Sequence, residues 1–198
     1  MEIVTIFDSG DFSESGGLLS IDFSGDGISE FERFFDRMND IEWLFGFFEE
    51  HQIELKNFKP SITRDDAITK TIEEVRYIED ALYAFFTDGV NGSGTGLDQL
   101  FRPLNDHEYM IVDLQKTKAR ADKKRIKNPW CRLYAIRLDK NLFIVTGGGI
   151  KLTRTMNEDA QLIKELDKLS RAYSYLKSNN ILNGQDLNDH YENDENNT

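Results

Sequence analysis

The spacing of hydrophobic residues changes along the first part of the chain. Hydrophobic and polar residues alternate weakly over residues 3–7 and 18–23, and a segment rich in Gly, Ser and Asp separates the two runs. That pattern predicts a β-hairpin. A capping box formed by Ser29 and Glu32 then precedes aromatic residues at helical spacing, and Asp40 can cap a second amphipathic segment. We therefore expect two short helices after the hairpin.

The longest amphipathic segment covers residues 63–86. Thr63 precedes two aspartates, which suit the positive end of a helix, and apolar residues follow at steps of three and four. The pattern ends before residues 89–96, which are dense in Gly, Ser and Asn and cannot form a core. We expect an acidic, mainly helical N-terminal region over residues 1–88 and a flexible linker over residues 89–96.

The chain after the linker is rich in β-forming runs. Strands are expected at residues 109–114, 132–138, 142–146 and 150–153. An apolar stripe that begins near Asn157 predicts a last helix to about Lys177. The expected fold is α+β, in which the hairpin and helices are followed by a small antiparallel sheet of about four strands and a C-terminal helix, over residues 97–180. The polar, acidic residues 181–198 are expected to be a disordered tail.

Charge is distributed very unevenly along the 198 residues, which carry a formal net charge of −12. Residues 1–113 carry −17, residues 114–154 carry +10, and residues 155–198 carry −5. Residues 114–154, the basic segment, hold half of all Lys and Arg. Such asymmetry predicts either a site for a polyanion or an internal electrostatic match between parts of the chain.

Several classes of protein and site are not expected. The single cysteine, Cys131, excludes an intramolecular disulfide. The three histidines are scattered, so we expect no metal site, and we expect no cofactor. The glycines at 147–149 lack the helix that a phosphate loop requires, and we expect them to form a turn or to let a partner approach the backbone closely. Without a secretory signal or a long apolar run, the chain is expected to be cytoplasmic and not bound to a membrane.

The basic segment supplies the candidate chemistry. Lys and Arg bind phosphate through charge-assisted hydrogen bonds, and aromatic faces stack on unpaired bases. Arg132 and Tyr134 are two residues apart and share one face of the predicted strand, whereas Leu133 and Ala135 are expected to face the core. The candidates for nucleic-acid binding are Lys123, Lys124, Arg125, Lys127, Trp130, Arg137 and Arg154. A solvated loop, or pairing with the acidic part of the chain, would account for the same charges.

The run WCRLYAIRLDKNLFIVTGGGIKLTRTMNEDAQLIKELDKLSRAYSYLK resembles the RelE/ParE toxin superfamily, most closely its HigB-like branch. In that branch a strand of the type R-L-Y-x-I leads through a hairpin to a strand with a Lys, a Thr-rich turn, and a helix that ends near a Tyr-Leu pair. The matching residues are Arg132, Leu133, Tyr134, Ile136, Lys151, Thr153, Thr155, Ala172, Tyr175 and Leu176. The likeness covers about residues 114–177.

The resemblance implies an α+β ribonuclease that cuts mRNA, often on the ribosome, without a metal. The 2′-hydroxyl attacks the adjacent phosphate, so a base, an acid and cations are needed. The catalytic candidates are Lys116, Lys118 or Lys151 as the base, with Arg120, Arg132, Arg137 or Arg154 for charge stabilisation and Tyr134 to stack or donate. An antitoxin-like partner is implied as well. The acidic N-terminal region, which the family usually lacks, could neutralise the basic face in cis.

Two other classes of function compete with RNA binding. The acidic helices of the N-terminal region could bind a basic partner in a non-catalytic protein-protein interaction module, with the basic strands serving only the fold. Alternatively, the acidic surface could mimic a nucleic acid. The residue pattern indicates neither the oligomeric state nor the substrate sequence.

Overall fold

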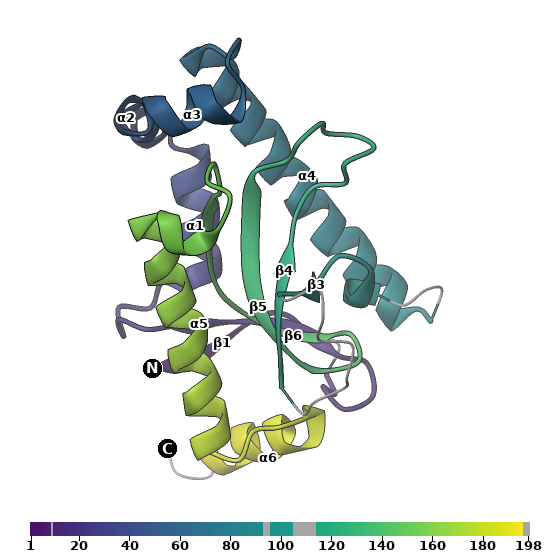
Figure 1. The fold of residues 1–198 in the computed structure, drawn as a ribbon. Helices are drawn as coiled ribbons and strands as arrows, with labels where there is room; N and C mark the ends of the chain where they lie inside the picture. The colour runs from purple at the N-terminus through teal and green to yellow at the C-terminus, as the bar shows by residue number, and fades with distance from the viewer. Residues whose placement is uncertain (9, 93–95, 105–113, 196–198) are drawn as a thin grey trace.

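The computed structural model describes residues 1–8, 10–92, 96–104 and 114–195, and helices cover both faces of its sheet (Figure 1). The strands are β1 (Glu2–Asp8), β2 (Gly17–Asp22), β3 (Arg102–Pro103), β4 (Gln115–Ala119), β5 (Cys131–Asp139) and β6 (Leu142–Ile150). The helices are α1 (Glu30–Asn39), α2 (Ile41–Glu50), α3 (Gln52–Phe58), α4 (Arg64–Val90), α5 (Ala160–Ser178) and α6 (Gly184–Glu195), with short 3-10 helices η1 (Gly96–Gln99) and η2 (Met156–Glu158). Within these ranges, no helix has the length and apolar character needed to cross a membrane.

The described strands form one mixed sheet in the order β1-β2-β6-β5-β4-β3. β2 pairs with β6 in parallel, and all other neighbours pair antiparallel. The mixture of helices and sheet agrees with the expected α+β class. The sheet nevertheless has six described strands and one parallel pair, instead of about four antiparallel strands, because the N-terminal hairpin docks on β6.

Two of the four strands expected in the C-terminal part are present. The runs at 132–138 and 142–146 correspond to β5 and β6, which form the expected hairpin. The run at 150–153 is not a separate strand, because β6 continues through the three glycines to Ile150. The strand expected at 109–114 falls almost entirely outside the described residues.

The glycines of β6 permit close packing on the strand, and they do not form a turn. A Cβ atom at Gly148 would lie 2.5 Å from a ring carbon of Phe34 and 2.5 Å from the carbonyl oxygen of Arg132. A Cβ atom at Gly147 would overlap the carboxylate of Glu165. The expected turn at residues 147–149 is therefore wrong, and the close approach seen at Gly147 and Gly148 is made by other residues of the same chain.

The sheet separates two hydrophobic cores. Leu133 and Ala135 of β5 face the core formed with α1, α2 and α4, as their alternation predicted. Tyr134 and Ile136 face the second core, which α5 and α6 cover. All nine residues of β6 are buried, as expected for a central strand with helices over both faces.

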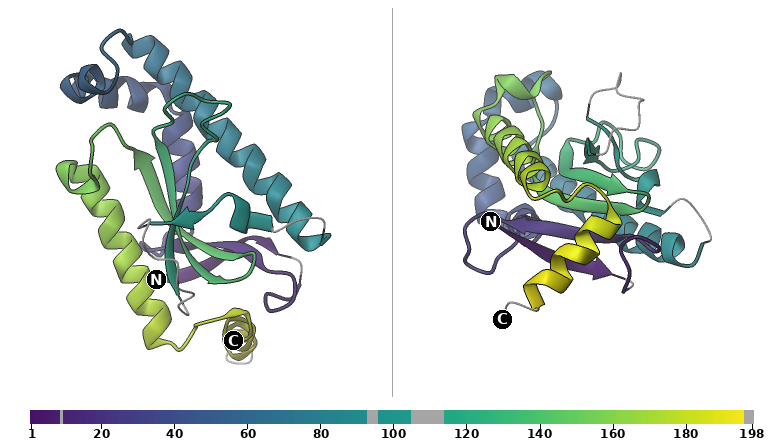
Figure 2. Two further views of the ribbon diagram at one scale, coloured as in Figure 1. Left: turned by 45° about the vertical axis from the view of Figure 1, so that its right-hand side comes forward. Right: turned by 90° about the horizontal axis from the view of Figure 1, so that it is seen from below.

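The expected disordered tail contains an ordered helix. Residues 184–195 form α6, which lies beside β1 (Figure 2). Leu187 is fully buried in the second core, and the Asn188 side chain donates a hydrogen bond of 2.9 Å to the carboxylate of Asp11. The prediction of disorder is wrong here, because a few contacts with the distant hairpin outweigh the polar composition of the segment.

Asn141, in the turn between β5 and β6, ties together segments from both halves of the chain. Its side-chain oxygen accepts a hydrogen bond of 2.7 Å from the Leu97 amide, and its side-chain nitrogen donates one of 3.0 Å to the Ser15 carbonyl. Gly89 and Gly96 lie so close that a Cβ atom on either would overlap this side chain. Gly89 and Gly96, at the two ends of the predicted linker, therefore pack against the turn between β5 and β6, and residues 93–95 lie outside the described part.

Replacing Asn141 with Ala is expected to lower the free energy of unfolding by about 2–4 kcal/mol. The substitution leaves a buried amide and a carbonyl without partners, and Asn141 also has a positive φ of 57° that Ala tolerates poorly. Asn180, which is exposed and has a φ of 55°, provides the matched control. In urea titrations, Asn180→Ala should lose only about 1 kcal/mol from backbone strain. Equal losses in the two variants would contradict the role given to the Asn141 side chain.

Candidate anion-binding site

The end of β4, the start of β5 and the segment after β6 enclose a cavity of about 440 Å3, which we call the cationic pocket. Its described lining residues are Leu104, Lys118, Arg120, Arg132, Tyr134, Lys151, Arg154, Met156 and Leu166. Five of these are Lys or Arg, and no carboxylate is among the described lining residues. The pocket is therefore strongly positive, and the acidic N-terminal region does not neutralise it through any described lining residue.

The pocket brings together most of the residues that the sequence suggested for catalysis. Lys118, Arg132 and Tyr134 meet because β4 and β5 are antiparallel neighbours, with Lys118 opposite Tyr134. Lys151 follows β6 and hydrogen-bonds through its amide to the Trp130 carbonyl. Two candidates, Lys116 and Arg137, lie outside this group, and the Lys116 ammonium donates to the Ser170 hydroxyl of α5 at 3.1 Å.

Tyr134 is the buried polar group at the centre of the site. Its side chain is 1% exposed, and its hydroxyl has no hydrogen-bond partner among the described residues. Burial raises the pKa of the phenol, and the carboxylates of Glu165 and Asp159 add to this, while Arg132 opposes it. The hydroxyl consequently stays protonated at physiological pH and is available to donate a hydrogen bond.

Arg132 is held in a fixed orientation beside Tyr134. Its guanidinium donates hydrogen bonds of 2.7 Å to the Cys131 carbonyl and 3.0 Å to the Pro129 carbonyl. Burial lowers the pKa of this group, and repulsion from Arg120 lowers it further. Arginine remains charged under such conditions, so the protein keeps a desolvated cation in place.

Lys151 organises the segment that carries Arg154. Its ammonium donates hydrogen bonds to the carbonyls of Thr153 at 2.8 Å and Arg154 at 2.6 Å. Burial lowers the pKa of Lys151, and the nearby positive charge of Arg132 adds to the effect. Lys151 is therefore the described lysine of the pocket for which both position and pKa favour a role as a base.

A buried carboxylate on α4 fixes the start of β5. Glu74 is fully buried and accepts hydrogen bonds from the amides of Trp130 at 2.8 Å and Cys131 at 2.7 Å. Lys70, one helical turn earlier, pairs with the same carboxylate. The sequence did not single out Glu74, because the amides that it accepts lie more than 50 positions away and a Lys four residues earlier is common on any exposed helix face.

Trp130 does not serve as a stacking platform, which corrects the sequence-based assignment. Its side chain is fully buried between Phe48 and Phe58, and its indole N–H donates to the Thr71 hydroxyl at 3.0 Å. The helices of the N-terminal region cover it completely. Those tertiary contacts are not visible in the local pattern of cations and aromatics.

The other residues expected to bind nucleic acid lie in different environments. Arg137 forms an ion pair of 2.7 Å with Asp98 and does not line the cationic pocket. Lys123 and Lys124 line a neighbouring cavity, and Arg125 lies 5.7 Å from the ring centre of Tyr77. Lys127 is exposed on the same loop.

Cys131 is buried, and burial raises its thiol pKa well above the ordinary value, so a nucleophilic role is disfavoured.

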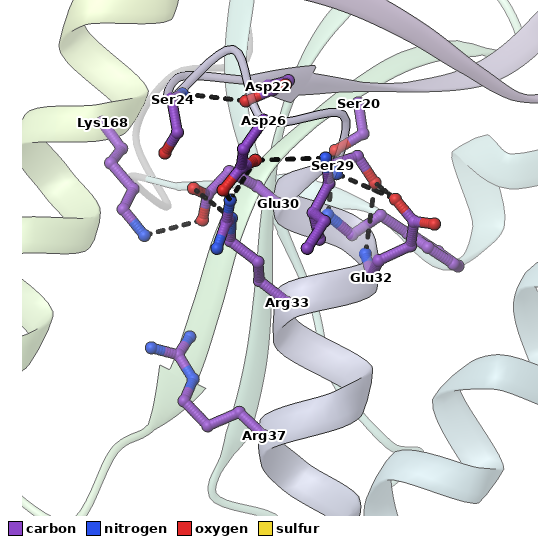
Figure 3. A network of polar contacts seen from close by, with 12 residues as sticks. Ser20, Asp22, Ser24, Asp26, Ser29, Glu30, Glu32, Arg33, Arg37 and Lys168 are labelled. Atoms are coloured by element: carbon purple, nitrogen blue, oxygen red, sulfur yellow. Dashed lines mark hydrogen bonds and ion pairs between the residues drawn. The ribbon is translucent and has the colours of Figure 1, made fainter.

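The loop between β2 and α1 has the start of a calcium-loop spacing that the sequence reading missed. Asp22, Ser24, Asp26 and Gly27 match its first positions, but Arg33 occupies the position of the final glutamate. Arg33 contacts Asp26 at 2.5 Å (Figure 3), and the Asp22 carboxylate accepts three backbone amides. The guanidinium of Arg33 thus takes the place that a metal cation has in a calcium loop. Among the described residues no group of three His, Cys, Asp or Glu is arranged to hold a metal.

Comparison of this chain with protein-family models, curated proteins and solved structures gives no match.

Replacing Tyr134 with Phe is expected to leave the free energy of unfolding unchanged or to raise it by about 1 kcal/mol. The substitution removes a buried hydroxyl that has no described partner and keeps the ring in the second core. Tyr191→Phe is the control, because the Tyr191 hydroxyl donates to the Ile3 carbonyl at 3.3 Å and its removal should be slightly destabilising. A loss of more than about 1 kcal/mol in Tyr134→Phe, measured by urea denaturation, would mean that the hydroxyl supports the fold.

Proposed function

We propose that the cationic pocket binds a phosphodiester group of RNA and that the protein is a toxin-type endoribonuclease that needs no metal. The observation that carries the proposal is that five cations line the same cavity as Tyr134, whose buried hydroxyl has no hydrogen-bond partner among the described residues. Phosphate oxygens accept charge-assisted hydrogen bonds from Lys and Arg, and the phenol adds a neutral donor. A cavity of about 440 Å3 also falls within the size range of small-ligand sites and fits a nucleotide-sized group.

RNA supplies its own nucleophile, which suits a pocket without a reactive thiol or a metal cluster among its described residues. In the proposed reaction the ribose O2′ attacks the adjacent phosphorus and the bond from phosphorus to O5′ breaks. The products are a 2′,3′-cyclic phosphate and a 5′-hydroxyl. The arginines of the pocket stabilise the charge that develops on the phosphorane, and Tyr134 donates to a non-bridging oxygen.

Lys151 is the proposed base and Lys118 the proposed acid. A neutral Lys151 amine keeps two N–H groups for the carbonyls of Thr153 and Arg154 and has its lone pair left for the O2′ proton. Its lowered pKa increases the fraction in this form. The Lys118 ammonium, opposite Tyr134 in the strand register, gives a proton to the departing O5′.

Neutralising the pocket is expected to weaken RNA binding without unfolding the protein. Arg132→Gln and Lys151→Gln each remove one phosphate-binding charge, and we expect a loss of at least about tenfold in affinity together with a shallower salt dependence. Lys140→Gln, an exposed lysine at the other end of β5, is the control. Fluorescence anisotropy with a labelled RNA measures the affinity, and thermal melting checks the fold. Unchanged RNA affinity in both pocket variants would refute the assignment.

Lys151→Arg is expected to separate binding from cleavage. The variant retains a positive charge, but arginine does not deprotonate near neutral pH, so RNA should bind while cleavage falls by at least about a hundredfold. In the wild type, the cleavage rate should rise with pH from 6 to 9, because a higher pH increases the neutral amine fraction of Lys151. The variant should lose this pH dependence. Cleavage at the wild-type rate in Lys151→Arg would exclude Lys151 as the base.

The alternative of a non-catalytic interaction module has support of its own on α2 and α3. Ile41 is 61% exposed and Ile53 is 75% exposed, and the acidic side chains of Glu42, Glu49 and Glu50 on α2 are exposed as well. An acidic surface with protruding apolar side chains suits a basic protein partner. This function predicts that substitutions in the cationic pocket affect folding alone.

A further inference from the structure

A second cavity adjoins the cationic pocket at Arg120. It measures about 350 Å3, and Arg120 lines both cavities. Tyr77 and Phe85 of α4 form one wall, and Lys123 and Lys124 of the loop after β4 form another. We call this cavity the aromatic cavity. It combines what the cationic pocket lacks, namely partly exposed ring faces, with further positive charge.

The rings of the aromatic cavity are accessible, unlike those of the basic segment. Tyr77 and Phe85 are half-buried at the edge of the first core, whereas Trp130 and Tyr134 are buried almost completely. Arg125 lies over the Tyr77 ring, as cations do beside aromatic groups that bind bases. The rings that can stack on a base are therefore on α4, and the basic segment contributes positive charge and the Tyr134 hydroxyl.

The cavities on the two sides of the cationic pocket differ in charge. Another cavity, of about 640 Å3, adjoins the cationic pocket on its other side and shares Arg154 with it. Two glutamates, Glu54 and Glu158, are among its described lining residues. The aromatic cavity has one carboxylate, Asp122, in its described lining, together with four cations, namely Arg102, Arg120, Lys123 and Lys124. A polyanion that leaves the cationic pocket is therefore attracted to this side and repelled on the side of the two glutamates.

We infer that the aromatic cavity binds the nucleotide next to the phosphodiester held in the cationic pocket. Its base stacks on Tyr77 or Phe85, its phosphate contacts Lys123 or Lys124, and Arg120 bridges the two sites. The inference rests on the proposed function and narrows the substrate class to single-stranded RNA, because bases within a duplex cannot leave their stack to reach the rings at low cost. An RNA of two or more nucleotides should therefore bind much more tightly than a mononucleotide.

The length dependence of binding tests this inference. Uridine 3′-phosphate occupies the cationic pocket alone, whereas labelled 2′-O-methyl oligouridines of two to six residues resist cleavage and reach both cavities. We expect Tyr77→Leu and Phe85→Leu, which keep an apolar side chain in the core, to weaken oligonucleotide binding by about five- to a hundredfold. Binding of uridine 3′-phosphate, measured by calorimetry, should remain unchanged. Tyr83→Leu is the control, because Tyr83 lies on the same helix, is 65% exposed and does not line the cavity.

The outcomes separate this inference from the proposed function. Oligonucleotide affinity equal to that of the wild type in Tyr77→Leu and Phe85→Leu would overturn the inference, and so would a parallel loss for the mononucleotide. In either case, a selective loss of binding in Arg132→Gln would leave the proposed function standing. If the wild type binds neither the mononucleotide nor any oligonucleotide, the proposed function itself fails.

Discussion

The fixed position of β5 depends on one buried carboxylate. Glu74 of α4 accepts the amides of Trp130 and Cys131, and Lys70 balances its charge. A buried charge is tolerated only when hydrogen bonds and an opposite charge compensate its desolvation. The three partners here are Lys70 of the same helix, Trp130 just before β5 and Cys131, the first residue of β5. Arg132 and Tyr134 come next in the strand, one and three residues after Cys131. The N-terminal helices therefore serve the site by holding the strand that carries it.

The cationic pocket is arranged at a cost to the folded protein. Burial lowers the pKa values of Arg132 and Lys151, and repulsion from neighbouring cations lowers them further. The Tyr134 hydroxyl is buried without a described partner. A buried polar group without a partner calls for an explanation, and a bound ligand is one. An anion would relieve the repulsion and satisfy the hydroxyl at the same time. This is the physical reason to place the function here, beyond the composition of the basic segment.

Local signals in the sequence predicted the elements that depend on neighbours along the chain. The capping boxes at Ser29 and Thr63 and the β5–β6 hairpin could be predicted because the residues that form each of them lie close together in the sequence. Alternation along β5 likewise placed Arg132 and Tyr134 on one face. Six of the eight catalytic candidates meet in one pocket, although β4, which carries Lys118, was not among the predicted strands.

Features set by distant parts of the chain could not be predicted in this way. The parallel pairing of β2 with β6 joins segments about 125 positions apart, and the burial of Trp130 depends on α4. The ion pair between Arg137 and Asp98 removed one candidate from the site for the same reason. Glu74, Tyr77 and Phe85 carried no signal of their own, since periodicity marks a core-facing helix without showing what it touches.

Hydrogen exchange with and without oligouridine, followed by mass spectrometry, tests the central claim most directly. If the two adjoining cavities bind single-stranded RNA, bound oligouridine should slow exchange in the loop at 120–127 and in the segment at 151–156. Exchange in α2 and α3 should stay the same. Unchanged exchange in both segments under conditions where the RNA is bound, or protection confined to α2 and α3, would contradict the account.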